Sequence, residues 1–416
     1  MSFEDQLRAD LRGTPVPSTL MPPGDLADHV LRRSARKRLV AQSAGASVAA
    51  LAVVGAVTAV AWLGHPVVRA VNGFPGDVTR TLSESPTPTP TPTPPPVQPP
   101  AMPTTCAGQR LPVPAGAPAS AIVTAVDPTG EFVGGRSYYP NNVRKLVLWD
   151  NGSVHAVNVD GFDMQINAIN SSGVAVGSTF VGDGTSTRAF VIHGTTATLL
   201  PGDGAAALSI NDSGVIVGTV PGGGRYVPVI WRSETAEPQP LPLPPGLTQG
   251  ENYIIDDDGT VAGEMKGTAS AVGTIVLWQP DGTPADLAGD YPMTDQHGQP
   301  LDVNEVMLLD YRDGWITIRL RDTGLDVVWN IHTRQTRWID GSSGNVNRYG
   351  WTLSWRDGEP VLDTDQGVLG LPHVSGVTYQ AHTAAVLTGL SDDGHTIVGY
   401  LSDDSPTLVP VIWLCT

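Results

Sequence analysis

Side chains suited to ligand binding occur in the polar segments that separate the apolar runs of this chain. A guanidinium group binds carboxylates, an aromatic ring stacks on a sugar or on an apolar side chain, and His both donates and accepts hydrogen bonds. Together such groups predict recognition of a glycan, a peptide or a small ligand, although each one alone is most simply an ordinary exposed loop residue. The candidates are Arg136, Tyr138, Tyr139, Arg188, Arg225, Tyr226, Tyr291, His297, His373, Tyr379 and His382.

Motifs for catalysis, metal binding and phosphate binding are missing from the 416 residues. The nine His never occur as H-x-x-H or H-E-x-x-H, and the chain contains no C-x-x-C, Gly-Lys-Ser/Thr or Gly-x-Ser-x-Gly. The acidic turn at residues 256–258 is interpreted as solvated and not as a Ca²⁺ site. We therefore predict no catalytic residue, no metal site and no cofactor.

A sequence pattern that repeats through residues 121–415 predicts the fold that positions the candidate residues. The clearest copy is Ser209-Ile-Asn-Asp-Ser-Gly-Val-Ile-Val-Gly218, and two weaker copies centre on Gly314 and Gly350. The turn glycines at 130, 173, 214, 259, 314, 350 and 394 are 43, 41, 45, 55, 36 and 44 residues apart. A repeat of this length is typical of propeller blades.

Each repeat has the residues of a β-hairpin followed by further strands. Apolar residues alternate into an Asn/Asp-rich turn, where Gly accepts positive φ. A second Gly, such as Gly218, follows in the return strand and indicates close approach of a neighbouring backbone. A third strand ends in Trp, as at Trp231, and residues 241–243 are expected to form a fourth strand. The composition agrees, since 47 Gly, 37 Pro and only 16% charged residues favour many short strands over long helices. The predicted fold is therefore an all-β, seven-bladed β-propeller, with six or eight blades as alternatives.

The two cysteines indicate how the ring closes. No fourth strand follows Trp413, and an unpaired strand is predicted at residues 111–114, just after Cys106. If this N-terminal strand completes the last blade, Cys106 and Cys415 lie side by side and form a disulfide, provided that the domain is in an oxidising compartment. Two unrelated free thiols are the alternative. With the hairpin turns on one face of the ring, the candidate binding residues fall on loops of the other face.

The repeats resemble a known family. The copies around Gly173 and Gly214 read Ala/Ser-Ile-Asn-x-x-Gly-x-x-Val-Gly, with Ala189-Phe190 downstream of the first. This sequence pattern resembles that of the extracellular repeat family named for its His-Ala-Phe signature. Arg188 stands at the His position, so the chain resembles a divergent member. The resemblance implies a surface or secreted propeller-like protein and no defined reaction.

Residues 41–64 are predicted to form a transmembrane helix. The chain has no Asp, Glu, Lys or Arg between Arg38 and Arg69. A helix formed by this uncharged segment is long enough to cross the hydrocarbon core of a membrane. A cleaved signal peptide is the alternative, but about 40 residues precede the apolar run. Basic residues cluster before the run, so the N-terminal tail, residues 1–40, is predicted to be cytoplasmic and everything beyond the helix extracytoplasmic.

A Pro-rich linker at residues 65–105 is expected to separate the helix from a propeller at residues 106–416. Its stretch from 86 to 103 alternates Pro with Thr and then becomes nearly continuous Pro, and therefore favours an extended polyproline II rod of roughly 55 Å. The chain beyond residue 69 carries 16 of the 24 basic and 36 of the 41 acidic residues. So negative a domain repels phosphate backbones, and we predict no nucleic-acid partner.

Three functions are compatible with this organisation. The favoured one is a membrane-anchored binding, sensing or scaffold module at the cell envelope, whose partner is an envelope protein or a glycan. The second is an enzyme that processes glycans or peptides from the loop-rich face. The third is transmembrane signalling through residues 1–40, which a pull-down with that tail would test.

Overall fold

The computed structural model describes residues 99–117, 120–140, 143–182, 184–267, 273–287, 293, 306–321, 324–339, 344–378, 384–402 and 407–416. The predicted cytoplasmic tail, transmembrane helix and all but the end of the linker lie outside these residues. All named elements of the described part are β-strands. No helix within that part is long and apolar enough to cross a membrane.

Within the described residues, twenty-seven strands form seven sheets, which we number as blades 1 to 7. Blade 1 contains β2 (Ala121–Val126), β3 (Phe132–Tyr138), β4 (Arg144–Asp150) and β5 (Ser153–Val157). Blade 2 contains β6 (Phe162–Ile169), β7 (Ala175–Val181), β8 (Ser186–His193) and β9 (Thr196–Leu199). Blade 3 contains β10 (Ala206–Ile210), β11 (Ile216–Gly222), β12 (Arg225–Trp231) and β13 (Gln239–Pro240).

The remaining blades follow the same order with two variations. Blade 4 contains β14 (Leu247–Ile255), β15 (Val261–Gly267), β16 (Gly273–Trp278) and β17 (Pro284–Asp286). Blade 5 contains β18 (Val306–Arg312), β19 (Trp315–Leu320), β20 (Asp326–Asn330) and β21 (Thr336–Ile339). Blade 6 has three strands, β22 (Thr352–Arg356), β23 (Glu359–Asp363) and β24 (Val368–Gly370), and blade 7 contains β25 (Ala384–Leu390), β26 (Thr396–Ser402), β27 (Val409–Cys415) and β1 (Cys106–Arg110).

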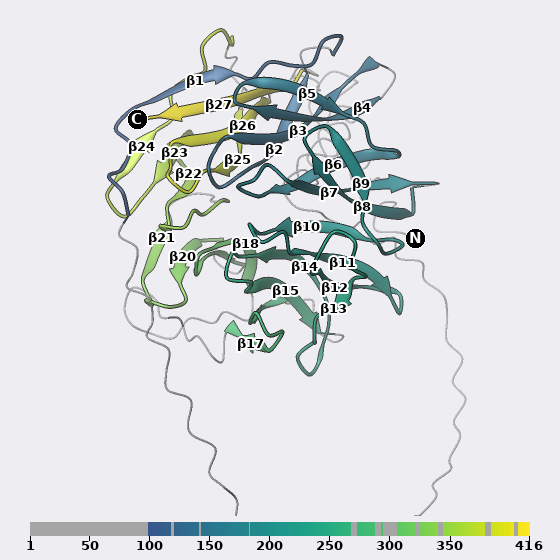
Figure 1. Ribbon diagram of the computed structural model, residues 1–416. Coiled ribbons are helices and arrows are strands. Elements are labelled where there is room, and N and C mark those ends of the chain that lie inside the picture. Colours follow the sequence, from purple (N-terminus) through teal and green to yellow (C-terminus); the bar gives the residue numbers. More distant parts are fainter. Residues whose placement is uncertain are drawn as a thin grey trace, which may run out of the picture. The chain divides into compact units, whose positions relative to one another are not determined.

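The seven sheets follow one another around a ring in chain order (Figure 1). First strands of successive blades contact one another, as β2 does β6 and β25, so they form the inner wall. Each of the seven clusters of buried apolar residues in the described part joins two neighbouring blades. An isolated blade would expose both of its apolar faces, and the ring buries them. The predicted all-β, seven-bladed propeller is confirmed.

The antiparallel order of each sheet defines two faces of the ring. The hairpin turns between first and second strands, such as the Gly214 turn between β10 and β11, lie on what we call the turn face. The segments between second and third strands, and the connections from one blade to the next, lie on the opposite side, the loop face. Blade 6 fits this scheme because Val346, in the first-strand position, forms a single bridge with Thr352 across the Gly350 turn.

The hairpin turns have the conformation that the sequence pattern predicts. All seven turn glycines have positive φ, between 74° and 90°. In blade 3 the Asn211 side chain accepts a hydrogen bond from the Val215 N–H at 2.9 Å, and its Nδ2 donates to the Asp256 carbonyl of blade 4 at 3.1 Å. The Asn of the repeat therefore caps its own turn and also links neighbouring blades.

The fourth strands differ from the prediction. We expected strands at residues 111–114 and 241–243, but the strands are β1 (Cys106–Arg110) and β13 (Gln239–Pro240). Leu111 and Leu241 each donate one more hydrogen bond to the third strand, to the Pro410 and Pro228 carbonyls at 2.9 Å. The next residue is Pro in both cases, which has no N–H and ends the ladder.

Blade 7 combines the first and last described strands of the chain. β1 pairs antiparallel with β27, so that Cys106 lies directly opposite Cys415. The two residues form a disulfide across 309 positions of sequence, as predicted, with their Cα atoms 4.0 Å apart.

Candidate ligand-binding face

The chain enters the propeller on the turn face. Pro100 and Met102 lie against the turn between β23 and β24, where Gln366 donates to the Pro100 carbonyl at 2.8 Å and accepts from the Met102 N–H at 3.1 Å. Thr104 then donates to the Thr416 carbonyl at 2.7 Å, just before the disulfide. The loop face therefore points away from the point of entry.

Two of the predicted binding residues meet on the loop face between blades 1 and 2. The Arg136 Nε donates to the Tyr138 hydroxyl at 3.0 Å, and the Arg136 Nη1 donates to Asp163 Oδ1 at 2.7 Å. Arg144 forms a second ion pair with the same carboxylate oxygen. Both guanidinium groups lie over the Tyr138 ring, with centroid distances of 5.4 and 5.8 Å. Two cations therefore share one carboxylate and one ring.

Other predicted residues lie apart from this group. Tyr139 packs under the Lys145 ammonium, 5.3 Å from its ring centroid, on the opposite surface of β4 from Arg144. Arg188 pairs with Asp203, in the connection from blade 2 to blade 3, at 2.9 Å. Arg225 and Tyr226 begin β12 on blade 3, where Arg225 is exposed and Tyr226 half-buried. Successive side chains of a strand point to opposite surfaces of its blade, and the residues lie on different blades. These side chains therefore do not form one site.

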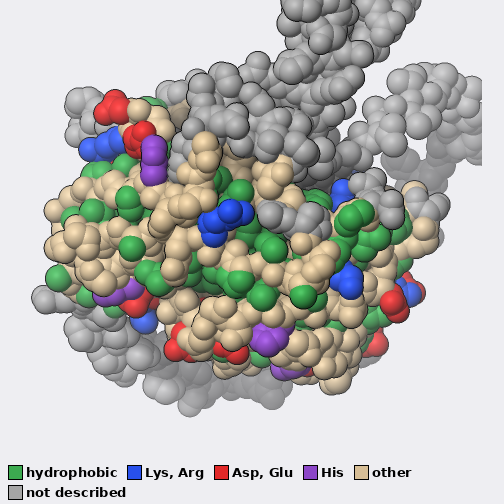
Figure 2. Space-filling view, turned by 90° about the horizontal axis from the view of Figure 1, so that it is seen from above, with side chains coloured by type: hydrophobic (Ala, Val, Ile, Leu, Met, Phe, Trp, Pro, Cys, Tyr) green, Lys and Arg blue, Asp and Glu red, His purple; other side chains and the backbone are tan. Residues whose placement is uncertain are grey.

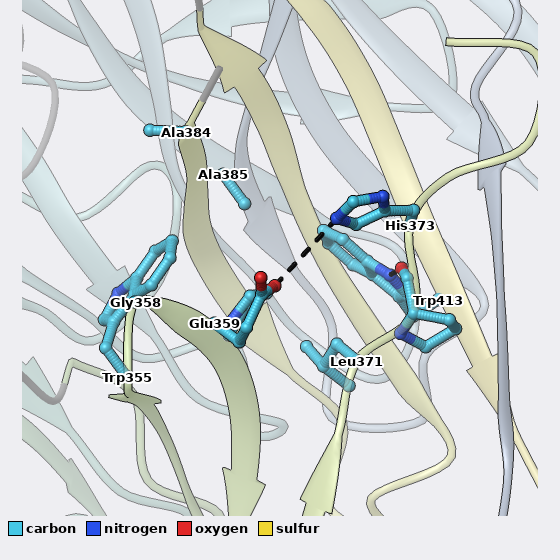
Figure 3. A pocket seen from close by; sticks show the side chains of 10 residues that line it. Trp355, Gly358, Glu359, Leu371, His373, Ala384, Ala385 and Trp413 are labelled. Atoms are coloured by element: carbon cyan, nitrogen blue, oxygen red, sulfur yellow. Dashed lines mark hydrogen bonds and ion pairs between the residues drawn. The ribbon is translucent and has the colours of Figure 1, made fainter. Parts of the chain in front are cut away.

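His373 lines a small pocket between blades 6 and 7, of about 120 Å³. Its Nε2 lies 4.0 Å from Glu359 Oε2, and Figure 3 shows the two side chains facing one another, with Trp355 on one side and Trp413 on the other. Trp413 is buried and donates its indole N–H to the Pro372 carbonyl at 2.8 Å, so the wall that it forms is held in place. The pocket combines an apolar lining with an exposed acid and an exposed His.

Three candidate residues, Tyr291, His297 and Tyr379, lie outside the described residues, as does His382. Conversely, Arg144, Asp163, Trp355 and Glu359 are found at the loop face but were not predicted. Glu359 directly follows a two-residue turn, Asp357-Gly358, and Trp355 lies two residues before it. The pattern of this segment indicates a hairpin and no ligand. Asp163 sits within β6, and only its position across the blade interface brings it to Arg136 and Arg144.

Arg312 is the centre of a cluster of charged side chains on the turn face. It donates to Asp392 of blade 7 from Nη2 at 2.7 Å and from Nε at 3.2 and 3.3 Å. It also lies 3.0 Å from Asp257 and 3.7 Å from Asp256 of blade 4. Burial raises the pKa of Asp256 to about 6, although Arg312 acts to lower it. Burial also acts to lower the pKa of Arg312, but the hydrogen bonds and charges of the carboxylates outweigh it and the pKa is raised. Asp256 and Asp257 are thus ion-pair partners, and the prediction that they are merely solvated is wrong.

The Asp310 carboxyl accepts hydrogen bonds from the Tyr311 N–H at 2.9 Å and the Val346 N–H at 2.8 Å. The residue as a whole is half-buried, but the carboxyl is withdrawn from water, and this burial raises its pKa to about 7. The described residues contain no group of three or more His, Cys, Asp or Glu side chains arranged to hold a metal ion.

Charged side chains are few on the outer side of blades 7 and 1. Figure 2 looks down on this side, where hydrophobic and uncharged side chains predominate and charged ones are scattered. Among the described residues, no large patch of one sign is visible from this direction. The described residues of this side therefore offer no broad charged surface to a ligand.

No protein-family model and no curated protein matches this chain. Solved structures with a similar fold include U3-55K, which is 10% identical with a TM-score of 0.45 over 74% of this chain and 98% of that one. YCF48 bound to D1 peptide is 13% identical with a TM-score of 0.43 over 77% and 98%. Pyrococcus horikoshii acylaminoacyl peptidase is 12% identical with a TM-score of 0.46 over 70% of this chain, which spans about half (51%) of the peptidase. These are likenesses of fold only, and the number of blades follows from the sheet topology of this chain.

Proposed function

We propose that this chain is a membrane-anchored binding module that presents the loop face of its propeller to a ligand at the cell envelope. Residues 41–64 act as the anchor, the Pro-rich linker acts as a spacer, and the ligand is an envelope protein or a glycan. The resemblance to the His-Ala-Phe repeat family fits an exported location of this kind.

One observation carries the proposal. The chain enters the propeller on the turn face, through Pro100, Met102 and the Cys106–Cys415 disulfide. A spacer attached there leaves the loop face free to meet a partner. The arginine pair of blade 1, which binds Asp163 of blade 2, and the pocket of blades 6 and 7 both lie on that face. Polar groups beside an apolar lining are common features of ligand sites.

The binding experiment uses the purified full-length chain on glycan and peptide arrays. Glu359→Gln removes the pocket's acid with little change in size. Asp212→Asn is the matched control, because it makes the same charge change at an exposed residue of the turn face, in the Gly214 turn.

We expect Glu359→Gln to weaken binding of a ligand that the wild-type chain retains, and Asp212→Asn to leave it unchanged. Equal binding by all three proteins would contradict a site in the pocket. Turnover of an array compound would favour an enzyme.

Anchoring is tested separately by fractionation. We expect the full-length chain to stay in the membrane fraction after extraction at alkaline pH, because a spanning helix is held by the hydrocarbon core. Deletion of residues 41–64 should release the protein. Retention of the deleted form would contradict the proposed anchor.

A further inference from the structure

The pocket between blades 6 and 7 carries one acid on an apolar lining. Among the described residues that line it, Glu359 is the only acid, and its side chain is 64% exposed. The His373 side chain is 65% exposed and its Nε2 lies 4.0 Å from the Glu359 carboxylate, which is too far for a hydrogen bond. The remaining lining residues are Gly, Trp, Leu, Pro and Ala. A ligand therefore meets a negative charge that it can reach, beside apolar surface.

The cation opposite Glu359 in the sheet is engaged elsewhere. Arg356 faces Glu359 in the pairing of β22 with β23, but its Nη2 lies 3.2 Å from Asp363 Oδ2, at the other end of β23. Asp363 also pairs with Arg337 of blade 5, so this group of charges lies toward blade 5 and away from the pocket. Glu359 is the first residue of β23, and its carboxylate turns toward His373 (Figure 3). The acid is therefore not neutralised by Arg356.

Trp355 supplies an aromatic surface in the same pocket. It is half-buried and lines the pocket together with Glu359 (Figure 3). The second indole, that of Trp413, is buried and donates its N–H to the Pro372 carbonyl at 2.8 Å, so it offers a ligand only apolar surface. The face of an indole ring attracts a cation, and a carboxylate strengthens that attraction.

The lining favours a ligand that donates hydrogen bonds from a positive charge. A carboxylate only accepts, whereas a sugar has several hydroxyl groups that each need a donor as well. Among the described lining side chains other than buried Trp413, only Trp355 and His373 have an N–H. The volume of about 120 Å³ is also below the roughly 300–1,000 Å³ of sites for drug-sized ligands, and suits a single side chain. The formal net charge of −17 adds a long-range attraction for cations.

We propose that this pocket binds a lysine side chain of a protein partner, with its ammonium group beside Glu359 and the Trp355 ring. The aliphatic stem of the lysine contacts Leu371 and Trp413. The proposal rests on the proposed function, because it names the ligand class of the same pocket. A lysine combines a compact cation, three N–H donors and an apolar stem, and each of these has its counterpart in the lining.

The test is isothermal titration calorimetry of the purified full-length chain with short peptides that are blocked at both ends, in about 0.15 M salt to screen long-range attraction. One peptide has a single Lys among Gly and Ser, and the two others have acetyl-lysine or norleucine in its place. We expect the Lys peptide to bind at least about fivefold more tightly than either, because both replacements remove the positive charge. Butylamine, a free amine with the same stem, should bind more weakly than the Lys peptide.

Variants locate the site. Glu359→Gln and Trp355→Ala should each weaken binding of the Lys peptide by at least about fivefold. Asp212→Asn makes the same charge change on the turn face, and Trp338→Ala removes a half-buried Trp of β21 that does not line the pocket. These two controls should change binding by less than about twofold. Thermal unfolding of each variant checks that the fold is intact.

Four outcomes would overturn the inference. Equal binding of the Lys and norleucine peptides would show that the charge is not recognised, and equal weakening by Glu359→Gln and Asp212→Asn would show only general attraction to an acidic protein. Butylamine that binds as tightly as the Lys peptide would make the ligand a free amine, and a neutral oligosaccharide that displaces the peptide would make it a sugar.

Failure here is distinguishable from failure of the proposed function. An array ligand that Glu359→Gln loses, in a protein with no preference for the Lys peptide, keeps the pocket as the binding site and removes only lysine as its ligand.

Discussion

At the residue scale, glycines in second strands occupy positions where the first strand leaves no room for a side chain. A Cβ on Gly177 would lie 1.9 Å from the Gln165 carbonyl oxygen, and one on Gly218 would lie 2.0 Å from that of Ala206. In these blades the first strand has a register shift close by, between Ile166 and Ala168 and between Ala207 and Ser209. The second Gly of the repeat is thus required by a close backbone approach, as its position in the sequence indicated.

We expect Gly218→Ala to lower the free energy of unfolding by about 3 kcal/mol, because the added methyl group must displace backbone. Gly370→Ala is the matched control, since Gly370 also lies in a strand and its Cβ would have no heavy atom within 4 Å. Denaturant unfolding of both variants measures the difference. Equal loss in the two variants would contradict the steric explanation.

The buried carboxyl of Asp310 predicts a dependence of stability on pH. Its pKa in the folded state is about 7, above the ordinary value of 3.8, so the folded protein binds more protons than the unfolded chain between these values. Stability from this group is therefore complete below about pH 4 and is lost as the pH rises to about 7. Asp256, with a pKa of about 6, acts in the same direction.

We expect the free energy of unfolding to fall between about pH 4 and pH 7, and to fall less in Asp310→Asn, which has no proton to lose. Chemical denaturation at several pH values measures both slopes. The difference between the two proteins isolates Asp310 from other titrating groups. Identical slopes would show that Asp310 does not titrate in this range.

At the element scale, Trp side chains of third strands attach a blade to the segment that arrives from the preceding blade. Trp149, Trp231, Trp278 and Trp413 donate their indole N–H to the carbonyls of Pro112, Pro201, Pro242 and Pro372, at 2.7 to 2.9 Å. Each Pro follows a Leu whose N–H closes the fourth-strand ladder of the preceding blade. The recurring Trp and Leu-Pro of the sequence are therefore two halves of one contact between blades.

Trp231→Phe should lower the free energy of unfolding by about 2 kcal/mol, because it leaves the Pro201 carbonyl without its donor and opens a small cavity. Trp338→Phe serves as the control, since Trp338 is half-buried and no hydrogen bond of its indole is found among the described residues. Thermal and denaturant unfolding compare them. A smaller effect for Trp231 than for Trp338 would argue against the contact.

At the scale of the whole propeller, contacts between non-neighbouring blades supplement those between neighbours. Arg312 of blade 5 binds Asp257 of blade 4 and Asp392 of blade 7. One guanidinium group therefore links three blades on the turn face. The disulfide joins β1 to β27 within blade 7. The covalent bond connects positions 309 residues apart, which restricts the unfolded chain strongly.

Replacement of both cysteines by Ser should lower the free energy of unfolding by up to about 5 kcal/mol, the upper range for a loop of this length. Unfolding with and without reductant measures the effect. Reductant should destabilise the wild-type protein and leave the double variant unchanged. A wild-type protein insensitive to reductant, even after complete reduction, would show that the strand pairing alone holds β1.

The sequence by itself determined the all-β class, seven repeats, their turn glycines and the pairing of Cys106 with Cys415, because hairpin turns and alternating strands are specified by neighbouring residues. It missed the ends of the fourth strands by a few residues, since the last hydrogen bond before each Pro depends on the adjacent strand. Only the tertiary structure decided which loop-face residues meet. Asp163 reaches Arg136 and Arg144, and His373 reaches Glu359, across contacts between strands or blades that local sequence does not encode.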